Sequence, residues 1–248
     1  MTANVNVPVI AGAMNSRDIG GFPADAGVTR SGVLFRSSSL ARLGDEGRDA
    51  LRAHGIRRII DLRDEDEARA EPSQTDGLGI ETVRAPLFLG STASFFVEDV
   101  SLRSMYRGLI DTAAGRIVDV VRAVLGAQPV LVHCTVGKDR TGVTVALMLD
   151  AVGVERDAVI ADYARTETLL PPERNARIVA YLRQAHPEAR NLEELATRSP
   201  APVMRELLDD LDARFGSTAG YLRAHGITGD ELAQLRRTLV DESGDLNA

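Results

Sequence analysis

The chain has 248 residues, a net charge of −7 and 44% hydrophobic residues. This apolar fraction is typical of soluble globular proteins, and the acidic balance argues against nucleic-acid binding, which usually requires a basic surface. No stretch approaches the ~20 apolar residues that span a bilayer, so we expect no stable membrane insertion. The N-terminus lacks a recognisable signal, and a lone cysteine fits a reducing compartment. We therefore expect a cytoplasmic protein, while export by a route without a recognisable signal stays open.

Short apolar runs alternate with helical patterns through the first half of the chain. In chain order these patterns predict a strand at 33–35, a helix at 45–54, a strand at 58–62, a helix at 64–71, a strand at 80–85, helices at 100–112 and 115–125, and a strand at 129–133. The last of these runs is rich in aliphatic residues, which is typical of a central strand.

The second half of the chain is almost entirely helical. Helices are predicted at 142–150, 155–169, 172–185, 202–215, 218–225 and 229–240. Because no linker, repeat or low-complexity tract interrupts the chain, a single domain over 1–248 is expected. The pattern predicts an α/β fold, with a central, mainly parallel sheet flanked by helices and an extended helical C-terminal part. The helices within about 163–214 could include a cover over a site, with proline-rich breaks at 171–172 and 199–202 as hinges. An ordinary helical layer explains them equally well.

The only cysteine and the only lysine lie within five residues of each other, in the string His133-Cys134-Thr135-Val136-Gly137-Lys138-Asp139-Arg140-Thr141-Gly142. This string follows a predicted strand and precedes a predicted helix. Strand, tight loop and helix together form an anion cradle, because loop amides point inward and the helix N-terminus adds its positive end. The string therefore predicts a phosphate-binding loop.

Several residue types in this loop suit phosphate transfer. The helix dipole, the loop amides and Arg140 favour the thiolate form of Cys134, which could attack a bound phosphorus. Arg140 can hold two phosphate oxygens in a bidentate fork. Gly137 permits a backbone conformation that other residues resist, and the Thr141 hydroxyl can assist departure of the sulfur. His133 is expected to orient the loop, and the predicted phosphate-binding residues are Thr135, Val136, Gly137, Lys138 and Thr141.

The loop resembles the phosphate loop of cysteine-dependent protein tyrosine phosphatases. Its Gly-Lys-Asp-Arg variant at 137–140 is similar to the atypical bacterial branch, which resembles dual-specificity and phosphoinositide phosphatases. Further family-like strings lie at 15–21, 34–37 and 60–63, and in the segment 215–222. The resemblance implies a tyrosine phosphatase-like fold and a covalent phosphocysteine route that needs no cofactor or metal. The scattered histidines and single cysteine also lack the spacing of a zinc site.

The general acid that protonates the leaving group is less clearly marked. The chain contains no tryptophan, so the familiar Trp-Pro-Asp loop is absent. Asp139 is the first candidate, because the resemblance implies that the atypical branch uses this loop aspartate. Asp99 is second, although a carboxylate before a helix is often only a cap. Asp61 is third and could instead brace the loop or pair with Arg63, a supporting residue.

Two features bear on substrate breadth. Lys138 is expected at the pocket mouth, where the resemblance implies contact with additional phosphates of a phosphoinositide. A solvated lysine that helps to hold the loop is an equally good interpretation. The aromatic residues Phe88, Phe95, Phe96 and Tyr106 could line a slot for phosphotyrosine. We expect a broad phosphate monoesterase whose partners are phosphorylated proteins, lipids or small molecules, and no nucleic acid.

Other readings of the loop remain. Arg17, Arg36 and Arg63 lie in family-like strings and could make the pocket locally positive, but structural ion pairs with Asp18, Asp61 or Asp64 are the favoured interpretation. The same loop could serve a nucleotide or sugar phosphatase. A non-catalytic phosphate-binding module is disfavoured by the complete set of cysteine, arginine and threonine. A rhodanese-like sulfurtransferase is disfavoured by the six-residue offset from Cys134 to Arg140 and by the Thr141-Gly142 tail.

Overall fold

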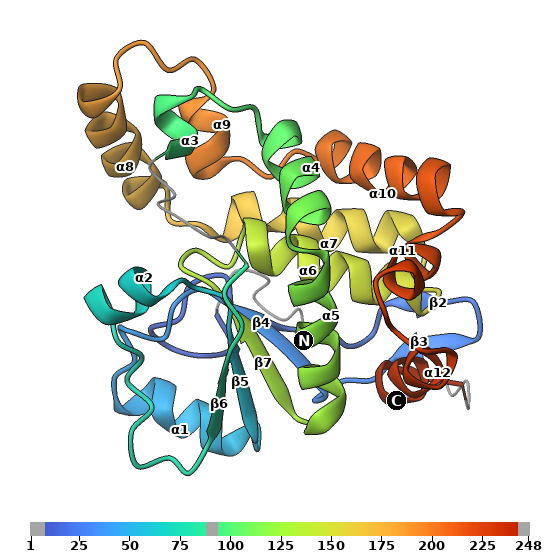
Figure 1. Ribbon diagram of the computed structural model, residues 1–248. Coiled ribbons are helices and arrows are strands. Elements are labelled where there is room, and N and C mark those ends of the chain that lie inside the picture. Colours follow the sequence, from blue (N-terminus) through green and yellow to red (C-terminus); the bar gives the residue numbers. More distant parts are fainter. Residues whose placement is uncertain (1–7, 88–93, 243–248) are drawn as a thin grey trace.

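The computed structural model describes residues 8–87 and 94–242 (Figure 1). Its centre is a five-stranded sheet in the order β1-β4-β7-β5-β6. Strands β4, β7, β5 and β6 are parallel, and only β1 runs antiparallel, on the edge. The predicted α/β architecture with a mainly parallel sheet is therefore confirmed. The strands are β1 (Arg17–Asp18), β4 (Leu34–Ser37), β5 (Arg58–Asp61), β6 (Glu81–Arg84) and β7 (Val130–His133).

Both faces of the sheet are covered. Successive side chains along each strand point to opposite faces and pack into two separate cores. Phe35, Ile59 and Leu131 belong to a smaller core that includes Leu51 of helix α1 (Asp45–Ala53). The adjacent residues of the same strands, Leu34, Ile60, Val130 and Val132 among them, belong to a larger core shared with the remaining helices. A run of aliphatic residues without polar alternation is what a parallel strand buried on both faces requires.

Helices α4 (Leu102–Thr112), α5 (Ala114–Gly126) and α6 (Asp139–Ala151) pack on the larger core. Helix α6 is buried along almost its whole length, as its apolar sequence predicts. The remaining helices are α2 (Glu65–Ala70), α3 (Ser94–Val97), α7 (Arg156–Leu169), α8 (Pro172–Ala185), α9 (Leu192–Thr197), α10 (Ala201–Phe215), α11 (Thr218–Ala224) and α12 (Gly229–Leu239). No helix among the described residues is both long and apolar enough to cross a bilayer.

Short elements escaped the sequence patterns. A small sheet joins β2 (Pro23–Ala24), β3 (Gly27–Thr29) and β8 (Val240–Asp241), which brings the two ends of the described chain together. Helix α9 was also not predicted, and α6 begins at Asp139 rather than at Gly142. Figure 1 shows α3, α8 and α9 grouped at one end of the molecule, beyond α2.

The parallel register sets the position of the site. His133 at the end of β7 lies level with Ser37 of β4 and Asp61 of β5. The loops that follow these three strands therefore meet at the carboxyl edge of the sheet. This is the edge at which open α/β sheets bind ligands.

Candidate active site

The predicted phosphate loop connects β7 to α6 at the centre of this edge. Its Gly137 has a φ of +73°, and a Cβ there would lie 2.4 Å from the Ser37 carbonyl oxygen. Only glycine therefore fits this position. In this conformation the Gly137 amide donates a hydrogen bond to Cys134 Sγ over 3.2 Å. The Thr141 hydroxyl is buried and has no hydrogen-bond partner within the described chain.

Two buried donors fix the other side of the loop. The Gly137 carbonyl accepts hydrogen bonds from Asn15 Nδ2 and Arg36 Nη2, each over 2.8 Å. Asp162 of α7 in turn accepts from Arg36 Nη1 and from Arg17 Nε, each over 2.6 Å. Burial raises the pKa of Asp162, but the two guanidinium groups outweigh it and bring the pKa to about 2. A buried network of charged side chains and hydrogen bonds thus holds the loop backbone in place.

This network was not predicted. The sequence suggested nearby carboxylates as partners of Arg17 and Arg36, but their partner is Asp162, which lies on a helix far along the chain. Asp18 instead accepts hydrogen bonds from the amides of Gly20 and Gly32. Only the fold brings α7 against the first strand, so the string at 15–21 alone could not identify the pairing.

Arg140 is oriented by a residue that the sequence analysis missed. Its guanidinium donates to both oxygens of Glu67, over 2.6 and 2.7 Å. The Thr135 hydroxyl donates to the same carboxylate over 2.5 Å. Burial raises the pKa of Glu67, but Arg140 and Thr135 more than offset it and lower the pKa to about 2. A bidentate clamp of this kind fixes the plane of the guanidinium.

Glu67 is itself positioned by a capping box. The Asp64 carboxylate accepts from the Glu67 amide, and Glu67 Oε2 accepts from the Asp64 amide. The spacing Asp-x-x-Glu at the start of a predicted helix is a sequence signal for this motif. That signal, directly after the family-like string at 60–63, could have drawn attention to Glu67.

A second buried group lies behind the loop. Asp61 pairs with Arg63 over 2.8 Å, as one of the expected alternatives had it. Burial raises the pKa of Asp61, but Arg63 and His133 more than offset it, and the pKa is lowered. His133 Nδ1 lies 3.2 Å from the Cys134 carbonyl oxygen, and burial lowers its pKa to about 4 against the opposing charge of Asp61. His133 is therefore neutral at pH 7 and contacts the loop backbone.

The loop side chains Lys138 and Asp139 form an ion pair. Lys138 is only 1% exposed, and its ammonium lies 2.7 Å from Asp139 and donates to the Arg198 carbonyl over 2.8 Å. It is therefore not a solvated charge at the pocket mouth, because the carbonyl before α10 and the adjacent carboxylate enclose it. Tyr106 also donates to Asp139 Oδ1 over 2.8 Å. The Tyr106 hydroxyl also lies 2.8 Å from the Tyr163 hydroxyl, so both tyrosines are linked to Asp139.

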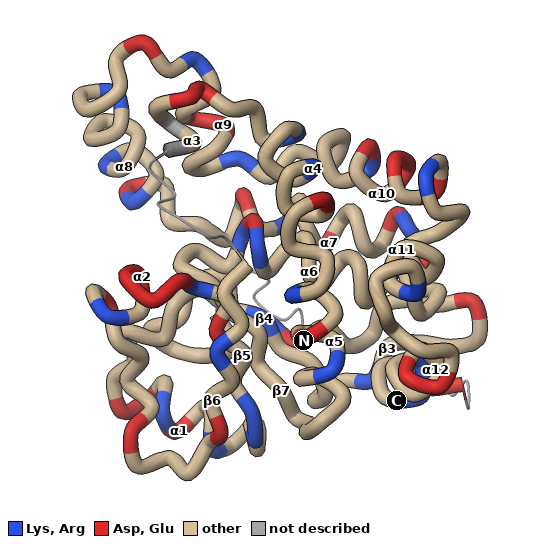
Figure 2. Tube along the Cα trace, viewed as in Figure 1, with Lys and Arg blue, Asp and Glu red and all other residues tan. Residues whose placement is uncertain are grey.

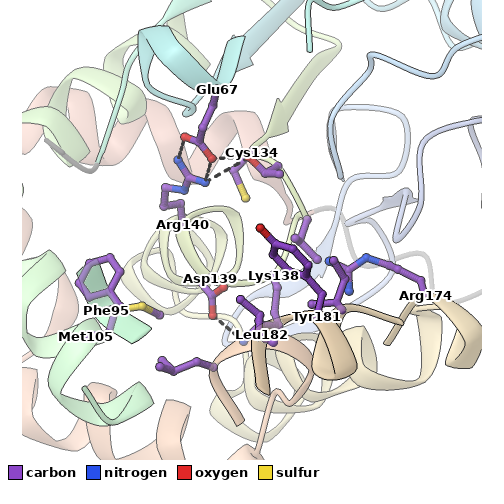
Figure 3. A pocket seen from close by; sticks show the side chains of 15 residues that line it. Glu67, Phe95, Met105, Cys134, Lys138, Asp139, Arg140, Arg174, Tyr181 and Leu182 are labelled. Carbon is purple, nitrogen blue, oxygen red and sulfur yellow. Dashed lines mark hydrogen bonds and ion pairs between the residues drawn. The ribbon is translucent and has the colours of Figure 1, made fainter. Parts of the chain in front are cut away.

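A cavity of about 300 Å³ opens over the loop (Figure 3). Its floor is mostly polar and contains Cys134, Thr135, Val136, Lys138, Asp139 and Arg140, with Glu67 beside them. Its walls are mostly apolar and come from α3, α4, α8 and α9, namely Phe95, Met105, Ile178, Tyr181, Leu182, Leu195 and Ala196, with Arg174 among them. A cavity with an apolar wall and a few convergent polar groups is typical of a small-molecule site.

The structure separates the candidate acids. Asp139 lies on the cavity floor, whereas Asp61 faces Arg63 behind the loop. The Asp99 carboxylate accepts from the amides of Arg190 and Asn191, each over 2.8 Å, and does not line this cavity. Of the expected aromatic residues Phe95 lines the cavity, whereas Tyr106 is fully buried and does not. Phe88 and the side chain of Phe96 lie outside the described part of the structure. Within that part no group of three or more metal-ligating side chains occurs.

Comparisons with known proteins agree with this site. A family model described as the tyrosine phosphatase family matches residues 8–241, and the chain belongs to this family. It is 31% identical to the triple specificity protein phosphatase PtpB of Mycobacterium tuberculosis, over 93% of this chain and 98% of the relative. A tyrosine-protein phosphatase of Nostoc commune is 30% identical, over 86% of this chain and 74% of the relative.

A solved structure is similar only in part. The core catalytic domain of the PP-IP phosphatase SIW14 from S. cerevisiae gives a TM-score of 0.42 and 16% identity, over 86% of this chain and 97% of that one. The family assignment rests on the sequence matches. With them, the chain is a hydrolase of the protein tyrosine phosphatase type, which cleaves phosphoesters.

Proposed function

We propose that the protein hydrolyses phosphate monoesters through a cysteinyl-phosphate intermediate formed on Cys134. The observation that carries the proposal is the shared position of Cys134 Sγ and Arg140 on the floor of one cavity. Cys134 Sγ accepts a hydrogen bond from the Gly137 amide, and Glu67 fixes the plane of the Arg140 guanidinium. Both groups are therefore oriented before substrate enters. Such preorganisation lowers the activation free energy, because the groups do not have to be aligned during the reaction.

In the first step the Cys134 thiolate attacks phosphorus. An S–P bond forms, the P–O bond to the leaving group breaks, and Asp139 gives its proton to the departing oxygen. Arg140 and the loop amides hold the phosphoryl oxygens, where negative charge is spread in the transition state. The Lys138 ammonium and the Tyr106 hydroxyl, both on Asp139, stabilise the carboxylate that remains.

In the second step water attacks phosphorus and the S–P bond breaks. The Asp139 carboxylate takes the proton of the attacking water, inorganic phosphate leaves, and the thiolate is restored. The Thr141 hydroxyl, which lacks another partner within the described chain, is suited to donate to the departing sulfur. No cofactor enters either step.

The cavity supports a range of leaving groups. Phe95, Met105 and Tyr181 offer apolar contact to an aromatic ring, as phosphotyrosine requires. The cavity volume of about 300 Å³ also leaves room for phosphoserine, phosphothreonine or an inositol ring. Helices α8 and α9 form one wall of the cavity and lie between the breaks at 171–172 and 199–202. In this proposal the two helices form a cover over the active site.

Release of phosphate from p-nitrophenyl phosphate tests the proposal. The Cys134→Ser variant should lose this activity while it still binds vanadate, because serine keeps the shape of the loop but not the nucleophile. Activity that persists in Cys134→Ser would contradict the proposal. A panel of phosphopeptides, phosphoinositides and nucleotide or sugar monophosphates at equal concentration would then rank the substrate classes.

A further inference from the structure

Three arginines near the catalytic cavity have no carboxylate partner among the described residues. Arg174 lines the cavity, and its guanidinium points inward (Figure 3). Its Nη1 donates a hydrogen bond to the neutral side chain of Asn175, over 2.9 Å. Arg177 lies about one turn further along α8, and Arg42 lies in the loop that follows β4. Both are exposed, and both are close enough for their charges to act on Arg174.

This arrangement is electrostatically unfavourable as it stands. Burial lowers the pKa of Arg174, and the positive charges of Arg177 and Arg42 lower it further. Asp139 opposes this shift, but its carboxylate already holds Lys138. Arg174 also stands in the first turn of α8, where the helix dipole disfavours a cation. An anion bound beside Arg174 would compensate this charge.

Two arginines of α4 show a contrast. Helices α4 and α10 contact each other, and both carry blue and red segments (Figure 2). There Arg103 pairs with Glu206, and Arg107 pairs with Asp210. The chain as a whole carries a net charge of −7, so acidic residues are plentiful. At Arg42, Arg174 and Arg177 no such pairing occurs within the described part of the chain, and of the three Arg174 lines the cavity.

Lys138 does not offer a free charge to a second phosphate in this structure. Its ammonium is buried between Asp139 and the Arg198 carbonyl, and both contacts would have to break before it could reach a ligand. Any positive charge offered to a second acidic group of the substrate has to come from another part of the cavity wall. Arg174 is the cation on the wall that has no carboxylate partner among the described residues.

We propose that Arg174, with Arg42 and Arg177, forms a second anion subsite beside the phosphate loop, which selects phosphomonoesters that carry a second phosphate group. This inference rests on the proposed function of the loop. The guanidinium of Arg174 would bind the second phosphate by a charge-assisted fork, and the two exposed arginines would attract it. The second phosphate could belong to a peptide or to an inositol ring, since the same group is recognised in both.

Two matched pairs of soluble substrates test the subsite. One pair is a phosphotyrosine peptide with a neighbouring phosphoserine or with serine, and the other is an inositol bisphosphate or the corresponding monophosphate. In at least one pair, kcat/KM should favour the doubly phosphorylated member by roughly tenfold or more, as for a hydrogen bond to a charged group. The pair that shows the preference identifies the source of the second phosphate.

Variants assign the preference to residues. Replacing both Arg174 and Arg177 by alanine should bring the kcat/KM ratio of the preferred pair close to one. Arg183→Ala is the matched control, because Arg183 lies on the same helix but pairs with Glu193, and it should leave the ratio unchanged. Thermal unfolding checks that the variants are folded. In the wild-type protein, a rise in ionic strength should also shrink the ratio, since exposed charges are screened by salt.

Equal kcat/KM values within both pairs would overturn the subsite. A preference that persists in the double variant, or one that salt does not reduce, would overturn it as well. Turnover of p-nitrophenyl phosphate by the same wild-type preparation separates this result from failure of the proposed function. If that ester is hydrolysed and the ratios are flat, only the subsite is wrong.

Discussion

The phosphate loop and the helical wall above it differ in how deeply their side chains are buried. Beneath the loop, Asn15, Arg36 and Asp162 are buried and joined by hydrogen bonds. On the wall, α8 has no fully buried residue, and Tyr181 is 66% exposed although it lines the cavity. A buried charged network tolerates little change, whereas half-exposed side chains tolerate much. Chemistry and substrate selection are therefore assigned to different parts of the same cavity.

The largest effect should come from the loop arginine. Arg140→Lys keeps a positive charge but removes the fork that Glu67 orients, so we expect kcat/KM on p-nitrophenyl phosphate to fall ~10³-fold. Steady-state kinetics measure this loss. Arg183→Lys on α8 makes the same change outside the cavity and should have no effect. A loss of less than about fivefold in Arg140→Lys would contradict the role assigned to the guanidinium.

Next in size is the effect of the buried network on stability. Asp162→Asn leaves Arg17 and Arg36 buried without a counter-charge, and the free energy of unfolding should fall by about 3 kcal/mol. Chemical denaturation at pH 7 measures this change. Asp157→Asn, on the same helix, removes an exposed pair with Arg205 and should have no measurable effect. Equal stability of the two variants would show that the network does not support the loop.

The general acid can be tested through leaving groups. Asp139→Asn should reduce turnover of phenyl phosphate by ~10²-fold and leave turnover of a dinitrophenyl ester nearly unchanged, because only the poor leaving group needs a proton. Asp99→Asn carries the same substitution away from the cavity and should not change the ratio of the two rates. Equal losses on both esters in Asp139→Asn would defeat the assignment.

A smaller effect is expected from the residue that orients Arg140. The pKa of Glu67 lies at about 2 in the folded protein and at 4.5 as its ordinary value. The carboxylate therefore stabilises the fold above pH ~4.5, and this contribution is lost as the pH falls toward 2. Allowing for solvent screening, it is worth about 1–2 kcal/mol.

Glu67→Gln removes the charge but can retain the capping box. The variant should be less stable than the wild type at pH 7, and the difference should shrink as the pH is lowered from about 4.5 toward 2. Denaturation curves at several pH values measure it. A difference that does not change with pH would show that the Glu67–Arg140 pair makes no electrostatic contribution.

The smallest effect on stability should come from the wall. Tyr181→Ala removes a largely exposed ring, so the melting temperature should hardly change, while KM for aryl phosphates should rise severalfold. Paired melting and kinetic measurements check this. A strong loss of stability with an unchanged KM would reverse the contrast between the wall and the loop.

Local patterns were sufficient to predict much of this structure. The aliphatic run of β7 predicted a central strand, and the string at 133–142 predicted a loop with Cys134 and Arg140 on one cavity floor. Both features depend on neighbours in sequence, which periodicity and residue type report directly. The start of α6 was misplaced by three residues, because Asp139 and Arg140 look like loop residues although they occupy the first helical turn.

Contacts between distant segments could not be predicted in the same way. Glu67 lies 73 residues from Arg140, and Asp162 lies 145 residues from Arg17. Lys138 is buried because a carbonyl 60 residues later reaches its ammonium. In each case the partner is defined by tertiary packing, and no single string of residues contains both halves of the interaction.

Direct detection of a phosphorylated enzyme tests the central claim, which is nucleophilic attack by Cys134. The protein would be acid-quenched during turnover of an aryl phosphate, digested, and examined by mass spectrometry. The peptide that contains Cys134 should carry one added phosphoryl group, and the same peptide of Cys134→Ser should carry none. A phosphoryl group on a different residue, or product formation with no phosphorylated peptide at any time, would contradict the account.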